Sequence, residues 1–267
     1  MPGPTPAIAA QELLVQLNHL RFSQEPLGEL AARRVRLEIQ KVKNSDPALG
    51  FALMGMLACI EWKPEEVKEN FRCAFAISIS REDIADDYSS ALVDVGFLNE
   101  AGDTAELNFE RFPDNPKILH SALDKLAGCL RFSKAMNVLD RISTLCIRCD
   151  KDLARAVTVF GQLFRLKNID ETKLKPLIDT VGAFLRSKKL RAWPFEIGLK
   201  GYGTDQRLPL IMSLYVPRHR SNPVDLSFEF AEYAAAQGID LCDDVVLIRF
   251  LPSEEGSGDD PSKGLPQ

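Results

Sequence analysis

The chain is poor in the features that membrane and secreted proteins depend on. No apolar run in its 267 residues reaches the roughly 18 residues that a membrane-spanning helix needs. The longest candidate, residues 49–60, contains Gly50 and Gly55 and stops at Glu61. The first residues lack the positive start and apolar core of a secretory signal. These absences predict a cytoplasmic protein with no membrane contact.

Cysteine and histidine are scarce and are not arranged as metal ligands. Of the six cysteines, only Cys146 and Cys149 have the spacing of half a zinc site, and no second CxxC or HxxxH motif supplies further ligands. The histidines His19, His120 and His219 have no partner motif nearby. We therefore expect reduced thiols and no metal, and a metal or redox role for the cysteine pair is the less favoured interpretation.

Signatures of catalysis are missing as well. The chain has no GxSxG, HExxH or DxDxDG motif and no set of kinase motifs. The segment Gly201–Gly203 lacks the third glycine and the Lys-Ser/Thr ending of a phosphate loop. Residues 218–220 (Arg, His, Arg) form a basic loop that suits a phosphate or an acidic side chain, or that is simply solvated. We expect no catalytic residue and no cofactor.

Charge is present but unevenly distributed, although the net charge is only -5. Residues 61–124 contain 15 acidic and 6 basic side chains, whereas residues 165–200 contain 9 basic and 4 acidic ones. The acidic segment disfavours nucleic acid and favours a partner with a basic or amphipathic segment.

Between residues 51 and 142, apolar residues recur at i, i+4 and i+7 in three predicted helices. The three sets are Val67, Phe71 and Ala74, then Ala105, Phe109 and Phe112, then Ala135, Leu139 and Ile142. The sets are offset by 38 and 30 residues, which is typical of stacked helical hairpins. Asp46 and Pro47 predict a helix start, and residues 99–102 predict a turn before a helix that begins at Asp103.

These residues resemble the tetratricopeptide repeat. That family places a large, a leucine-like and a glycine-like residue on the first helix, and Ala, Phe or Tyr, and Ala on the second, followed by proline. The matching residues are Phe51, Met54, Gly55, Val67, Phe71 and Ala74 in one repeat, and Ala105, Phe109 and Pro116 in the next. The resemblance covers roughly residues 45–145. It implies a right-handed array of helical hairpins whose first helices line a groove.

Polar residues on the first helices are the candidate partner-binding residues that the resemblance implies. They are Asp87, Ser90, Asp94, Lys117, His120 and Asp124. The corresponding residues of the preceding first helix are apolar, namely Leu49, Ala52, Met56 and Cys59. Either the leading helix packs over these apolar positions, or they form the apolar end of a groove whose other end is acidic.

After residue 191 the pattern changes from helical spacing to short strands. Residues 195–199 and 208–216 predict two strands, a helix follows from Pro223 to Gly238, and residues 245–251 predict a third strand. The predicted fold is mainly α, a hairpin repeat array with a small C-terminal α/β (β-β-α-β) cap. We expect a flexible leader (1–10), a helical domain (11–190), an α/β domain (191–251) and a disordered acidic tail (252–267).

The sequence thus predicts a non-catalytic protein-interaction module, in an adaptor, chaperone-like or immunity-type role. The alternative is a nucleic-acid-linked regulator that uses the basic segments 186–191 and 218–220. An enzyme sited in the C-terminal cap is the least favoured hypothesis.

Overall fold

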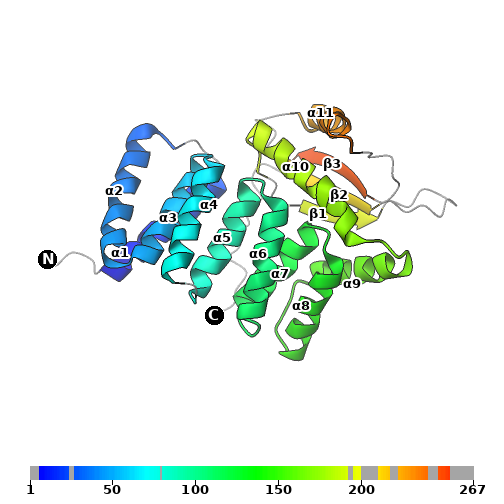
Figure 1. The fold of residues 1–267 in the computed structure, drawn as a ribbon, viewed down its shortest axis with the longest axis horizontal. Helices are drawn as coiled ribbons and strands as arrows, with labels where there is room; N and C mark the ends of the chain where they lie inside the picture. Colours follow the sequence, from blue (N-terminus) through cyan, green and yellow to red (C-terminus); the bar gives the residue numbers. More distant parts are fainter. Residues whose placement is uncertain are drawn as a thin grey trace. The chain divides into compact units, whose positions relative to one another are not determined.

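The structure is a computed structural model that describes residues 6–23, 27–78, 80–191, 195–199, 210–216, 222–239 and 246–252 (Figure 1). The chain divides into two compact units, residues 1–189 and 190–267. The first is a series of packed helices, and the second is a small mixed sheet with one helix, so the predicted mainly α class with a β-β-α-β unit is confirmed. In the described ranges, no helix is long and apolar enough to cross a membrane.

The first unit is built from helices that follow one another along the array. They are α1 (Pro6–Ser23), α2 (Glu29–Ser45), α3 (Pro47–Ile60), α4 (Pro64–Ile77), α5 (Glu82–Asp94), α6 (Leu98–Arg111), α7 (Pro116–Gly128), α8 (Phe132–Thr144), α9 (Lys151–Leu166) and α10 (Lys175–Lys188), with a 3-10 turn η1 (Glu171–Leu174) before α10. From α2 to α9 each helix packs against the next, as Figure 1 shows for the middle of the array.

Short polar side chains start several of these helices. The carboxylates of Asp46 and Asp150 and the amide oxygen of Asn115 accept hydrogen bonds from backbone N–H groups in the first turns of α3, α9 and α7. These bonds satisfy N–H groups that have no partner within the helix. Proline also lies in the first turn of α3, where its missing N–H costs nothing. The predicted start at Asp46 and Pro47 is confirmed.

The hairpins repeat with a period of 34 residues. The second helices α4, α6 and α8 begin at residues 64, 98 and 132. Trp62, Gly96 and Leu130, which follow the ends of α3, α5 and α7, all have a positive φ and recur at the same interval. A left-handed residue at this position ends each first helix and reverses the chain into its partner. The structure therefore contains a regular helical-hairpin repeat.

The predicted register of the second hairpin is wrong by one helical turn. The residues 34 positions after Val67, Phe71 and Ala74 are Ala101, Ala105 and Asn108, and all three are buried. Phe109 and Phe112 are only half-buried, and Phe112 already follows the end of α6. Asn108 is tolerated in the core because its amide donates to the carbonyl oxygen of Ala85 at 2.8 Å.

The turn predicted at residues 99–102 is also wrong, because these residues lie in the first turns of α6. The chain reverses at Gly96 instead, which has a φ of 77°. Such a value favours glycine, so this residue was the better turn signal.

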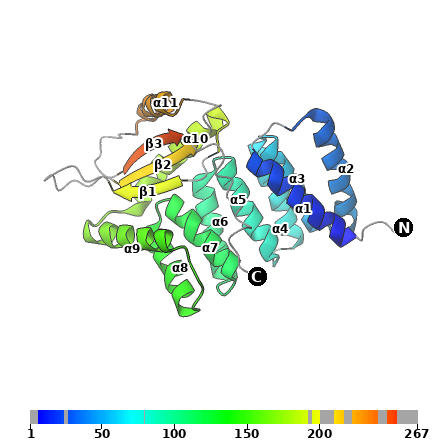
Figure 2. The same ribbon diagram turned by 180° about the vertical axis from the view of Figure 1, so that it is seen from behind.

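Helix α1 lies across α3, as seen from behind in Figure 2. Its buried residues Leu13 and Leu17 belong to the same apolar cluster as Ala52, Met56 and Cys59 of α3. The interpretation that the leading helix covers the apolar positions is therefore confirmed for Ala52, Met56 and Cys59, whereas Leu49 is only half-buried.

Helix α10 leaves the serial order and packs against α6. The side-chain amide of Asn99 donates to the carbonyl oxygen of Lys175 at 2.8 Å, and Arg186 donates to that of Gly96. Gly96 and Gly182 approach so closely that a Cβ on Gly182 would lie 2.2 Å from the Gly96 oxygen. Helix α10, which is not one of the repeated hairpins, thereby holds the α5–α6 turn in place.

The second unit contains β1 (Phe195–Leu199), β2 (Leu210–Val216), α11 (Pro223–Ala236) and β3 (Val246–Pro252). β2 lies in the centre, antiparallel to β1 and parallel to β3, with Met212 opposite both Ile197 and Ile248. A parallel pair needs a crossover, and α11 lies within this connection and packs against β3. The rings of Phe230 and Phe250 meet edge to face at 6.0 Å.

Candidate functional site on helices α5 and α7

Polar side chains gather on the first helices of two successive hairpins. α5 packs between α3 and α7. α3 contains no charged residue, whereas α5 carries five acidic side chains and α7 carries one acidic and two basic ones. We use the name polar face for the following set: Asp86, Asp87, Asp94, Lys117, Ser121, Asp124 and Lys125.

Asp86 is the centre of a buried ionic network between α5 and α7. Its carboxylate lies 3.7 Å from the Lys125 ammonium nitrogen and 3.1 Å from that of Lys117. Ser121 donates to Asp86 and accepts from Lys125. Burial opposes the charge on Asp86, but Lys125, Ser121 and Lys117 outweigh it, so the pKa of Asp86 lies below its ordinary value. Burial lowers the pKa of Lys125. Each charge here is compensated by its neighbours.

Asp87 and Asp124 differ from Asp86, because neither forms an ion pair or a side-chain hydrogen bond in the part of the chain that the structure describes. Burial raises the pKa of Asp87 to about 6, and Lys117 only partly offsets this. Burial also raises the pKa of Asp124 to about 7, against the influence of Lys125. A cation arriving next to either carboxylate would favour its charged form.

Asp94, in contrast, already has a cationic partner. It is 6% exposed and forms an ion pair with Arg21 of α1. The thiol sulfur of Cys59 lies 3.6 Å from the same carboxylate oxygen. Burial acts to lower the pKa of Arg21, but Asp94 outweighs it and the pKa is raised. The Arg21–Asp94 ion pair therefore attaches α1 to α5, and it compensates the charge of Asp94.

The other predicted groove residues lie on the same two helices with different surroundings. Lys117 is exposed and contacts Asp86, and His120 is exposed on α7. Ser90 is half-buried on α5. In the 34-residue register, Asp124 is the equivalent of Ser90, and His120 is the equivalent of Asp86.

Four residues of this region, Arg21, Asp86, Ser121 and Lys125, are absent from the set predicted from the sequence. A local signal existed for α7, since Lys117, Ser121 and Lys125 are spaced four residues apart and share one helical face. Arg21 had no such signal, because its partner lies 73 residues away in the sequence.

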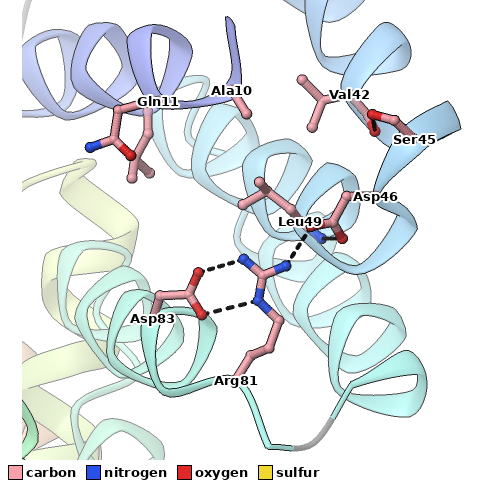
Figure 3. A pocket seen from close by; sticks show the side chains of 9 residues that line it. Ala10, Gln11, Val42, Ser45, Asp46, Leu49, Arg81 and Asp83 are labelled. Atoms are coloured by element: carbon pink, nitrogen blue, oxygen red, sulfur yellow. Dashed lines mark hydrogen bonds and ion pairs between the residues drawn. The ribbon is translucent and has the colours of Figure 1, made fainter. Parts of the chain in front are cut away.

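A pocket of about 410 Å³ lies at the other end of α1 (Figure 3). It is bounded by Ala10, Gln11 and Leu14 of α1, by the end of α2, and by the starts of α3 and α5. The Arg81 guanidinium lies between Asp46, at 2.5 Å, and Asp83, at 2.6 Å. The pocket is therefore lined on one side by two apolar residues and one glutamine of α1, and on the other by charges that already form ion pairs.

No group of three or more metal-ligating side chains that could hold an ion occurs in the described residues. Cys146 is exposed in the turn after α8, and burial raises the pKa of Cys149, which does not favour a reactive thiolate. Of the basic segments, Lys188 and Lys189 are exposed near the end of α10. Residues 201–203 and 218–220 lie outside the described residues.

The chain matches no family model, no curated protein and no solved structure.

We predict that the double substitution Asp87→Asn, Asp124→Asn stabilises the protein at pH 8. Both pKa values are raised in the folded state above the ordinary value of 3.8, so the two carboxyls favour folding while protonated, and this contribution is lost progressively as pH rises from the ordinary pKa through the folded values of about 6 and about 7. With allowance for solvent screening, we expect a gain of about 2 kcal/mol at pH 8, or roughly 5 °C in Tm.

The gain should shrink at pH 5 and vanish near pH 4, which thermal unfolding followed by circular dichroism would measure. An equal gain at all three pH values would contradict the raised pKa values.

Proposed function

We propose that this chain is a non-catalytic protein-binding module whose α5 and α7 accept a basic segment of a partner protein. The observation that carries the proposal is the pair Asp87 and Asp124, two partly buried carboxylates that form no ion pair among the described residues, on the first helices of a hairpin array. Lysine or arginine side chains of a partner would supply the missing charge.

The period of the array supports a tetratricopeptide-like ancestry, which we include in the proposal. The 34-residue interval between second helices equals the length of that repeat. Val67, Phe71 and Ala74 are fully buried and follow its pattern. In the corrected register the matching proline is Pro113, five residues after Asn108, and not Pro116 as matched from the sequence. Arrays of this type bind other proteins along an extended face.

The same double substitution, Asp87→Asn and Asp124→Asn, tests this function. We expect it to weaken the binding of a physiological partner at least tenfold at pH 8, although it stabilises the fold at that pH. Weaker binding together with a higher free energy of unfolding would show that the carboxylates act in binding, because a variant damaged in its structure would lose both. The measurement is affinity purification with mass spectrometry, followed by calorimetric titration of the partner that wild type captures.

The matched control is Glu65→Gln with Glu110→Gln, which removes two exposed carboxylates from the second helices α4 and α6. The control should bind like wild type. If the control and the test variant lose the partner equally, or if neither variant loses it, then the partner does not bind through the polar face.

A further inference from the structure

One face of helix α1 is held on the array by apolar contacts and by an ion pair. One stripe of α1, made by Ala10, Leu13 and Leu17, is buried, whereas Val15 on another side is 61% exposed. Beyond the apolar stripe, Arg21 carries a single positive charge to Asp94 of α5. Leu13, Leu17 and Arg21 thus lie at i, i+4 and i+8 on one side of α1. A groove recognises an amphipathic helix through apolar anchors spaced in this way.

The receiving surface is complementary to that stripe. Ala52, Met56 and Cys59 of α3 form its apolar part, and they belong to the same cluster as Leu13 and Leu17. The acidic part begins at Asp94 and continues to Asp87, whose negative charge also acts on Arg21. An apolar area that leads into carboxylates is suited to a helix with basic residues at one end.

The fit of α1 is incomplete at its N-terminal end. The pocket of about 410 Å³ lies beside Ala10 and Leu14, and among the described residues the small Ala10 side chain does not fill it (Figure 3). A helix with a larger apolar side chain at the place of Ala10 would bury more surface in the same site. A competitor of similar chemistry could therefore bind more tightly than α1 does.

We propose that α1 is an intramolecular ligand that covers the surface of α3 and the end of α5 next to the proposed site, and that the partner presents an amphipathic α-helix with an arginine or lysine, which displaces α1 from α3 and α5 and extends to Asp87. This rests on the proposed function, which it deepens by stating the form of the basic segment. In free protein only the fraction of molecules with α1 released binds the partner, so the apparent affinity is reduced by that fraction.

The test uses the full chain and a fluorescent peptide with the sequence of residues 6–23. The substitution Arg21→Ala in the chain releases α1 more often but leaves Asp94 ready for the arginine of the peptide. We expect the peptide to bind this variant about tenfold more tightly than it binds wild type, by fluorescence anisotropy. A peptide carrying Arg21→Glu should bind either chain at least tenfold more weakly, and one carrying Ala10→Phe should bind more tightly.

Hydrogen exchange of the full-length wild type provides a measurement that does not depend on any variant being folded. We expect amides of α1 to exchange faster than those of α5 and α7, and faster again when the Ala10→Phe peptide is added. Exchange of α1 only together with α5 and α7, or equal peptide affinity for wild type and the Arg21→Ala chain, would overturn the proposal.

The two proposals fail separately. If capture of the partner depends on Asp87 and Asp124 but the peptide does not compete with α1, only the displacement of α1 is wrong. If the substitutions Asp87→Asn and Asp124→Asn also leave capture of the partner unchanged, then the partner does not bind through the polar face.

Discussion

Replacing Lys125 with methionine is expected to lower the free energy of unfolding by about 3 kcal/mol, because the change leaves a buried carboxylate short of its main cation. Asp86 is 8% exposed, and the Lys125 ammonium lies 3.7 Å from it on the buried side of the network. Lys117 remains as a partner, but its side chain is 65% exposed and its attraction is weakened by water. The loss is expected at the lower end of the range for broken buried pairs.

The double variant Lys125→Met, Asp86→Leu separates this explanation from a packing defect. With both charges gone, the protein should recover most of the lost stability, since a buried ion pair and an apolar pair are often of similar stability. Urea unfolding of the wild type, both single variants and the double variant gives the coupling energy. Strictly additive losses would mean that Asp86 and Lys125 do not stabilise each other.

Local signals in the sequence were sufficient to predict the type of fold. Asp46 and Pro47 mark a helix start by their own chemistry, and Val67, Phe71 and Ala74 repeat with the period of a buried helix face. The change to strands after residue 191 was equally visible in alternating apolar residues. None of these signals requires knowledge of a distant contact.

The register of the second hairpin could not be predicted in the same way. Its core positions are Ala101, Ala105 and Asn108, two small residues and one polar residue, which give a weak hydrophobic pattern. Phe109 and Phe112, which follow, are larger apolar residues, so the sequence pattern placed them in the core, although they are only half-buried. The buried position of Asn108 depends on a bond to Ala85, 23 residues earlier in the chain.

The candidate site shows the same limit. Asp87 and Asp124 could be placed on the first helices from spacing alone, but whether another described residue forms an ion pair with them depends on the folded chain. Asp94 looked equivalent to them in the sequence, yet Arg21 compensates its charge. Which carboxylates remain available to a partner is decided by contacts between helices that are far apart in the sequence.

The second large effect is expected from Gly182→Ala, which should destabilise the protein by about 2 kcal/mol. In an ordinary helix, alanine is more favourable than glycine by about 1 kcal/mol. Here the new Cβ would lie 2.2 Å from the carbonyl oxygen of Gly96, and backbone atoms cannot rotate away as a side chain does. α10 must therefore shift away from the α5–α6 turn, which also weakens the bond from Arg186 to the Gly96 oxygen.

Gly161→Ala in α9 is the matched control, because it makes the same chemical change in a buried helical position. Its Cβ would lie 2.1 Å from the sulfur and 2.9 Å from the Cγ atom of Met136, but both atoms belong to a flexible, half-buried side chain that can adopt another rotamer. The control should therefore change the free energy of unfolding by less than about 1 kcal/mol. If thermal unfolding shows Gly182→Ala to be as stable as the control, then α10 is not held by the Gly96–Gly182 contact and the array does not need it as a clamp.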